Sequence, residues 1–184
     1  AIAQRVCLAE DKRIVFIVEF VRYIGSGFKE LATNRSIKFS IESECPGMNI
    51  WFDDTKMQRI LNNIYSNAFK FTPDGGLIST IVATEKKDEK IFVRIEISDT
   101  GCGISEKDLN VIFDRFYQSE PIPGVTGSGI GLHMVKEYVS LHNGKIEVHS
   151  KIGVGTTFLI YIPSDLKGDD SESKIPAMSP DVEE

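Results

Sequence analysis

Apolar residues recur along the chain with the spacing of short helices and strands. Four segments have the helical period of three to four residues: 17–31, about 54–71, about 106–117 and 130–142. Gly25 and Gly27 lie inside the first of these patterns and weaken it. Asp53 and Asp54 stand directly before the second, and either can serve as the N-cap residue. The pattern therefore predicts amphipathic helices that face one core.

Between these helices, apolar residues alternate with other residues as they do in half-buried strands. Strands are predicted at 37–41, 49–52, 77–84, 91–98, 145–150 and 156–162. The polar stretch 86–90 separates two of them and predicts a β-hairpin. Grouped strands with helices between them predict an α+β fold, a two-layer α/β sandwich. One mixed sheet is covered on one face by helices.

The composition of the chain excludes several classes of function and points to none in particular. The net charge is −6, and residues 165–184 hold seven acids and two lysines, so residues 1–164 carry only −1. No basic stripe interleaved with aromatics is present, which argues against a nucleic-acid partner. The three cysteines form no C-x-x-C pair and indicate neither a zinc site nor a disulfide framework. No apolar run approaches the ~20 residues that span a bilayer, so we expect no direct membrane contact by this domain. This composition fits a cytoplasmic domain, and any membrane anchor of a longer protein lies outside this chain.

The most informative stretch is Asp99-Thr-Gly-Cys-Gly-Ile104, which follows the predicted strand 91–98. Two glycines one residue apart let the backbone approach a flat ligand closely. A carboxylate at a strand end can accept a hydrogen bond from the exocyclic amine of adenine. The alternative is that Asp99 only caps the next turn, as Asp often does in loops. Gly101 and Gly103 favour the ligand over this alternative.

A second glycine cluster, Gly127-Ser-Gly-Ile-Gly131, opens the helix predicted at 130–142. Exposed N–H groups at a helix start bind anions, so this cluster is a candidate phosphate site. A flexible linker has a similar composition, and the ordered helix behind the cluster favours the phosphate site. The preceding segment, 118–129, has two prolines and no apolar period, which predicts a mobile loop.

Asn63, Asn67 and Lys70 are spaced i, i+4 and i+7, which places them on one helical face. The amide oxygen of Asn is a hard ligand that suits Mg²⁺, and a lysine can neutralise phosphate charge. The alternative is a solvated polar face opposite the core. Arg115 either reaches phosphate or is a surface arginine, and both alternatives stay open. The flanking rings at 113 and 116 are expected to be core anchors.

His133, His142 and His149 have no partner at a metal-ligand spacing, so we expect them to be structural or exposed. No nucleophilic triad is visible in the sequence.

Five segments together resemble the sequence boxes of sensor histidine kinases, in family order and at family spacing. They are Asn63–Thr72 (N box), Asp99–Ile104 (first glycine box), Phe113–Phe116 (F box), Gly127–Leu132 (second glycine box) and Gly153–Phe158 (closing motif). The resemblance covers roughly residues 15–163. One such box is weak evidence, whereas five in order are highly specific.

This resemblance implies the Bergerat ATP-binding fold, shared with type II topoisomerases, mismatch-repair ATPases and a heat-shock chaperone. It implies ATP and Mg²⁺ as cofactors, Asn67 as the principal metal ligand, and Asp99 as the residue on the adenine amine. It assigns catalytic roles to Asn63, Lys70 and Arg115, and a lid to the residues between the F box and the second glycine box. The implied nucleotide-binding residues are Asn63, Asn67, Lys70, Asp99, Gly101, Gly103, Ile104, Gly127, Ser128, Gly129, Gly131 and Leu132.

The phosphoacceptor segment of the family is absent, because no histidine occurs before His133. The sequence therefore predicts an isolated catalytic domain at 15–163. Residues 1–14 would be a linker or the end of a helical dimerisation domain, and 164–184 an acidic, disordered tail or linker. The implied partners are the phosphoacceptor and dimerisation domain of the same kinase and a response-regulator receiver domain.

Two other functions stay open at this point. A module of the same fold could sense ATP or dock a partner without catalysing transfer. A self-sufficient ATPase of the topoisomerase type is disfavoured, because those enzymes carry a glutamate base where Asn63 stands. An amide cannot accept a proton from water as a carboxylate does.

Overall fold

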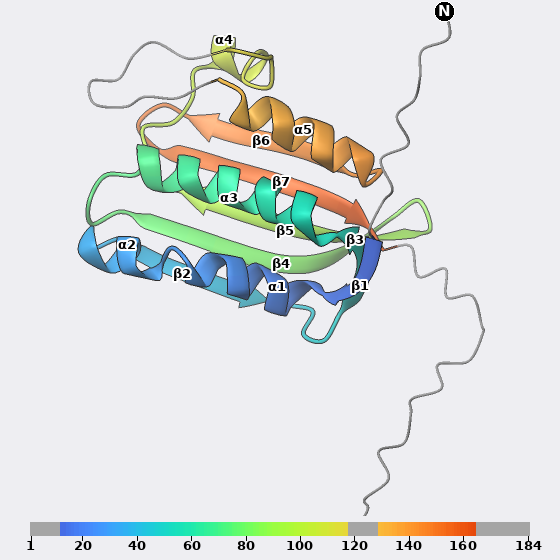
Figure 1. Ribbon diagram of the computed structural model, residues 1–184. Helices are drawn as coiled ribbons and strands as arrows, with labels where there is room; N and C mark the ends of the chain where they lie inside the picture. Colours follow the sequence, from blue (N-terminus) through green and yellow to red (C-terminus); the bar gives the residue numbers. More distant parts are fainter. Residues whose placement is uncertain (1–11, 118–128, 165–184) are drawn as a thin grey trace, which may run out of the picture.

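The computed structural model describes residues 12–117 and 129–164, and Figure 1 shows how their elements are arranged. The elements in chain order are β1 (Lys12–Phe16), α1 (Ile17–Ser26), α2 (Lys29–Asn34), β2 (Lys38–Ser43), β3 (Asn49–Asp53), α3 (Asp54–Phe71), β4 (Leu77–Lys87), β5 (Lys90–Asp99), α4 (Glu106–Leu109), α5 (Gly131–Leu141), β6 (Lys145–Lys151) and β7 (Gly155–Pro163). The predicted loop at 118–129 falls almost entirely outside the described residues, as does the acidic tail beyond 164.

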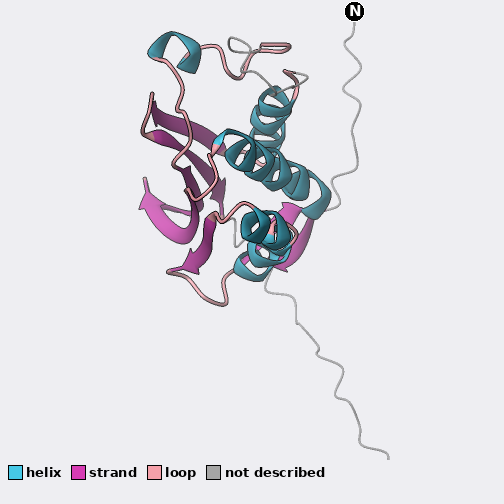
Figure 2. Cartoon of the chain, turned by 90° about the vertical axis from the view of Figure 1, so that its left-hand side faces the viewer, coloured by secondary structure: helices cyan, strands magenta, loops and turns pink. Residues whose placement is uncertain are grey.

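Five strands form one sheet in the order β2-β4-β5-β7-β6. Strand β2 runs parallel to β4 and the other neighbours are antiparallel, so the sheet is mixed. Helices α1, α3 and α5 cover one face of this sheet, and Figure 2 shows the two layers edge-on. The predicted fold class is confirmed, and the predicted hairpin is the antiparallel pair β4–β5.

Helix α3 forms the centre of the helix layer. Its N-cap is Asp53, whose Oδ1 accepts the Lys56 N–H at 2.9 Å, which settles the choice between the two candidate caps. Tyr65 and Phe69 are fully buried on the sheet side of the helix. The Tyr65 hydroxyl is also satisfied, at 2.9 Å from Thr80 Oγ1 on β4. The hydrophobic stripe predicted from sequence therefore faces the sheet, and this fixes which residues of α3 face away from it.

Three elements differ from the sequence-based prediction. The helix expected over 17–31 is two helices that meet at Gly27, and a Cβ on Gly25 would lie 2.3 Å from the Ile41 side chain. The helix expected over 106–117 is only the short α4, followed by turns. Strand β1 was not predicted; it pairs antiparallel with β3 and begins three residues before the expected boundary at 15. In both cases the helix ends although the apolar spacing continues, so helical periodicity alone does not reveal the break.

Candidate functional site

Asp99 ends β5 on the same sheet face as the core residues Ile95 and Ile97. It lies opposite Thr156 of β7, and its Oδ1 accepts the Gly101 N–H at 2.8 Å. Burial raises the pKa of this carboxyl, and the backbone N–H groups of Gly101 and Thr156 only partly offset the rise. Asp99 therefore does cap the next turn, and it does so from a position with few water contacts.

The first glycine loop is held from two sides. On one side, the Cys102 N–H donates to the Phe71 carbonyl at the end of α3, at 3.3 Å. On the other, the Gly153 N–H donates to the Cys102 carbonyl at 2.8 Å. Gly103 has φ +75°, and a Cβ there would lie 2.1 Å from the Lys151 carbonyl oxygen. Glycine is required at this position because both the backbone angle and the space exclude a side chain.

An open depression of about 320 Å³ lies beside Asp99, with Ser150, Gly155 and Thr156 in its lining. Its volume is at the lower end of the range typical of small-molecule sites. Ser150 Oγ accepts the Ile104 N–H at 2.8 Å and lies 2.9 Å from Thr156 Oγ1. Sequence reasoning missed both hydroxyl residues, although Thr156 lies inside the closing glycine motif and so carried a signal.

The polar face of α3 meets the start of α5. Asn63, Asn67 and Lys70 are each half-buried, so the alternative of a fully solvated face is not what the structure shows. The Asn63 Nδ2 donates to the Arg59 carbonyl at 2.8 Å. A Cβ on Gly131 would lie 2.5 Å from Asn63 Oδ1, so a side chain where α5 begins would displace the Asn63 amide. The structure thus brings the N box and the second glycine box together.

The F box is only partly buried. The Phe113 ring packs edge-on against Phe158 at 6.5 Å, and its carbonyl oxygen lies 3.2 Å from His133 Nδ1. Phe116 is 61% exposed with φ +66°, so the expectation that it anchors the core is wrong. The exposed Arg115 guanidinium lies 4.9 Å from the Phe116 ring centroid, which is a cation–π distance.

The remaining candidate residues lie partly within and partly outside the described residues. Ile104 and Leu132 pack against the hydrophobic core at the edges of their loops. Gly129 begins the second described segment with φ +67°, and its carbonyl accepts the Phe116 N–H at 2.9 Å. Gly127 and Ser128 lie outside the described residues, so their predicted phosphate contacts stay predictions.

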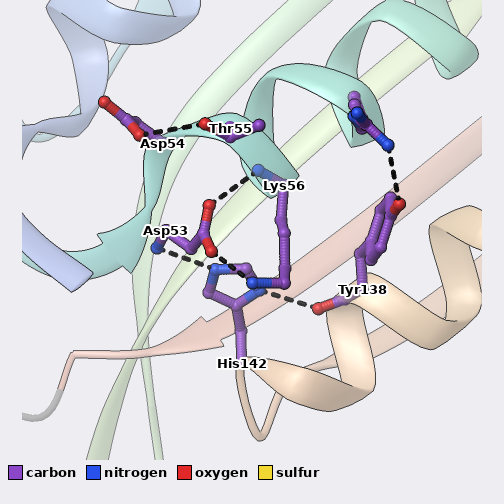
Figure 3. Close-up of polar contacts among 7 residues, drawn as sticks. Asp53, Asp54, Thr55, Lys56, Tyr138 and His142 are labelled. Atoms are coloured by element: carbon purple, nitrogen blue, oxygen red, sulfur yellow. Dashed lines mark hydrogen bonds and ion pairs between the residues drawn. The ribbon is translucent and has the colours of Figure 1, made fainter. Parts of the chain in front are cut away.

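A buried histidine fixes how α5 lies against α3, as Figure 3 shows. His142 Nε2 accepts the Asp53 N–H at 3.1 Å, and His142 Nδ1 lies 2.7 Å from the Tyr138 carbonyl. Because Nε2 accepts, the ring proton is on Nδ1 and donates to that carbonyl. A second tie joins Arg59 of α3 to the Tyr138 hydroxyl at 3.1 Å. These contacts hold the C-terminal end of α5, whose other end lies against Asn63.

Comparison with known proteins identifies the family. The model of the histidine kinase-, DNA gyrase B- and HSP90-like ATPases matches residues 52–166. The chain belongs to this family. The matched stretch runs from the end of β3 through β7 and includes Asp99, Asn63 and the start of α5. Members are ATP-binding domains, so ATP is the expected ligand of the site.

Relatives of the chain are named as histidine kinases. "Histidine kinase P4" of Formosa agariphila is 36% identical over 80% of this chain, but this chain spans only 11% of that protein. The nucleotide-free catalytic domain of histidine kinase ThkA superposes with TM-score 0.73 at 23% identity, over 84% of this chain and 98% of that one. Full-length ShkA in complex with AMPPNP superposes with TM-score 0.71 at 25% identity, over 84% of this chain and 31% of that one.

Within the described part of this ATPase-family domain, no helix is both long and apolar enough to cross a membrane. The same residues hold no group of three or more His, Cys, Asp or Glu side chains that could bind a metal ion.

Proposed function

We propose that this chain is the ATP-binding catalytic domain of a histidine protein kinase. It binds Mg-ATP and transfers the γ-phosphoryl group to a histidine on a separate dimerisation domain, for relay to a receiver aspartate. One observation carries the proposal. The Asn63 amide lies against the first residue of α5, while Asp99 is half-buried at the end of β5. Both groups lie on the helix-covered side of the sheet, which supports a nucleotide site that extends from one to the other.

The residues fit the ligand that the family implies. Asp99 has carboxylate lone pairs beyond those used by Gly101 and Thr156, and these can accept from the adenine amine. The amide oxygens of Asn63 and Asn67 are hard donors of the type that holds Mg²⁺ together with phosphate oxygens. Bound Mg²⁺ would supply neutralisation of the phosphate charge, the main requirement of phosphoryl transfer.

Other residues of the chain place and neutralise the phosphates. Lys70 lies on the same face of α3 as the two asparagines, where its ammonium can pair with a phosphate oxygen. Arg115 precedes the loop predicted to act as a lid, and its exposed guanidinium can turn toward the γ-phosphate when nucleotide is bound. The domain acts in the cytoplasm under this proposal, and the acceptor histidine comes from outside the chain.

A module that senses ATP without transferring phosphate is the second candidate. It is kept because this chain supplies no acceptor and spans a small part of its relatives. Self-sufficient hydrolysis is disfavoured by the residue type at position 63. The Asn63 amide nitrogen already donates to the Arg59 carbonyl, and its oxygen cannot accept a proton from water.

The test separates binding from transfer. The chain is incubated with γ-labelled ATP and Mg²⁺, alone and with a separately produced phosphoacceptor helix pair from a histidine kinase. We expect no acid-labile phosphate on the chain alone and phosphohistidine on the added helices. Asp88→Asn, in the exposed β4–β5 turn, is the matched control and should behave as the wild type. Nucleotide binding without any transfer would favour the sensing module, and no nucleotide binding would refute both functions.

A further inference from the structure

Arg35 lies just after α2, outside all five sequence boxes and outside the stretch matched by the family model. Its guanidinium caps the C-terminal end of α3. Nη2 donates to the Thr72 carbonyl at 2.8 Å, Nη1 donates to the Phe69 carbonyl, and Nε lies 2.7 Å from Asp74 Oδ1. The last carbonyls of a helix have no intrahelical partner. The Arg35 side chain satisfies one of them, that of Phe69, together with the carbonyl of the C-cap residue Thr72.

The two carbonyls that Arg35 binds flank Phe71, whose own carbonyl is the contact between α3 and the first glycine loop. The Cys102 N–H donates to it at 3.3 Å. A Cβ on Gly101 would lie 2.8 Å from the same oxygen, so the loop rests directly on this carbonyl. Gly101 then donates to Asp99 Oδ1 at 2.8 Å. An unbroken series of contacts therefore connects the Arg35 guanidinium to the Asp99 carboxylate, through the end of α3 and the glycine loop.

The backbone of Arg35 holds the same region a second time. Its carbonyl accepts the Gly75 N–H at 3.0 Å, which fixes the turn between α3 and β4. That turn leads into Leu77, whose N–H donates to Thr100 Oγ1 at 2.9 Å and whose carbonyl accepts the Thr100 N–H at 3.0 Å. The glycine loop is thus bonded through Thr100 and through Cys102 to the segment 71–77, which Arg35 contacts.

We propose that Arg35 is a positioning residue for adenine recognition. By binding the carbonyls on either side of Phe71, it sets the place of the glycine loop and so the direction of the Asp99 carboxylate. The inference rests on the nucleotide binding proposed above and adds a residue that touches no ligand. Lysine cannot replace this arginine fully, because a single ammonium does not reach three acceptors in a fixed fork.

The test measures the affinity of Arg35→Gln for a non-hydrolysable ATP analogue with Mg²⁺ by calorimetry. We expect a loss on the order of tenfold, the size of a lost charge-assisted hydrogen bond. Amide hydrogen exchange of Cys102 reports the position of the loop and should be faster in the variant than in the wild type. Arg35→Lys should recover part of the affinity. Arg94→Gln is the matched control, because Arg94 also pairs with carboxylates but on the helix-free face of the sheet.

The outcomes distinguish this inference from the proposed function. If the wild type and Arg94→Gln both fail to bind, the proposed function is wrong. If both bind and Arg35→Gln binds equally well with unchanged Cys102 exchange, the positioning role is wrong. If amide hydrogen exchange in Arg35→Gln rises equally throughout the core, the substitution destabilises the whole domain, and the positioning role of Arg35 is again wrong. If Arg35→Gln does not fold, the affinity of Arg35→Lys is compared with that of the wild type instead. Equal affinity would contradict the proposal that adenine recognition depends on the three contacts of the guanidinium.

Discussion

Asp99→Asn separates the turn-capping role of this carboxylate from its proposed role in adenine recognition. The amide has nearly the same shape and keeps one oxygen, which can still accept the Gly101 N–H. It loses the negative charge, and its NH₂ group faces a ligand amine that is also a donor. We therefore expect weaker nucleotide binding in a protein that is still folded.

The magnitude follows from the kind of hydrogen bond that is lost. Hydrogen bonds to charged groups contribute about 1.5–3 kcal/mol, which corresponds to roughly a ten- to 150-fold loss of affinity. Stability should change in the other direction. Burial raises the pKa of Asp99, so the folded state binds this proton more tightly than the unfolded state does. Ionised Asp99 therefore disfavours folding, and its contribution worsens as pH rises from about 4 through the raised pKa.

Calorimetric titration with the ATP analogue at several pH values measures the first effect. Wild-type affinity should fall as pH falls through the raised pKa of Asp99, because the protonated carboxyl loses its charge, and Asp99→Asn should lack this dependence. Thermal unfolding near neutral pH should show the variant at least as stable as the wild type. Asp88→Asn is the control for a lost surface charge. Unchanged affinity in the folded variant would remove Asp99 from the site.

Two further substitutions test the other end of the site. Asn67→Ala should lose the metal-dependent part of the affinity, so its dissociation constants with Mg²⁺ and with chelator should converge; a difference as large as in the wild type would show that Asn67 does not bind the metal. Gly131→Ala places a Cβ 2.5 Å from Asn63 Oδ1 and should displace that amide. Affinity should then drop several-fold with little change in melting temperature, because alanine favours the helix. Gly27→Ala, whose added Cβ would meet nothing closer than 3.4 Å, is the control, and equal affinity in both variants would refute the contact.

Much of the fold was predictable because its strands have one buried and one open face. Ile91 to Ile97 alternate cleanly for this reason, and the strand β5 was placed within a residue or two. Strand β1 was not found, because it has only five residues and pairs with β3, more than thirty positions away. The split between α1 and α2 was also missed. The chain leaves the helix at Gly27 and Phe28, where the apolar spacing continues without interruption, so periodicity does not mark the break.

The candidate site was predictable where a motif is local and unpredictable where it is not. Asn63 and Asn67 share a helical face by spacing alone, and the Asp99 loop is continuous in sequence. By contrast, Arg35 reaches carbonyls 34 and 37 residues away, and no local signal marks such a contact. The exposure of Phe116 was likewise missed, because its left-handed backbone turns the ring out of the core.

The sequence left a structural role and a ligand role for Asp99 as alternatives, but under the proposed function the structural role supports the ligand role. A carboxylate offers about four lone-pair sites, and the N–H groups of Gly101 and Thr156 use two of them. Those two bonds hold the group in one orientation, so a ligand amine meets an acceptor whose ordering cost was met during folding. Burial weakens competition from water at the same atoms. Under the proposed function, the turn cap therefore prepares Asp99 to recognise a base, and the contacts of Phe71 and Arg35 connect this cap to the end of α3.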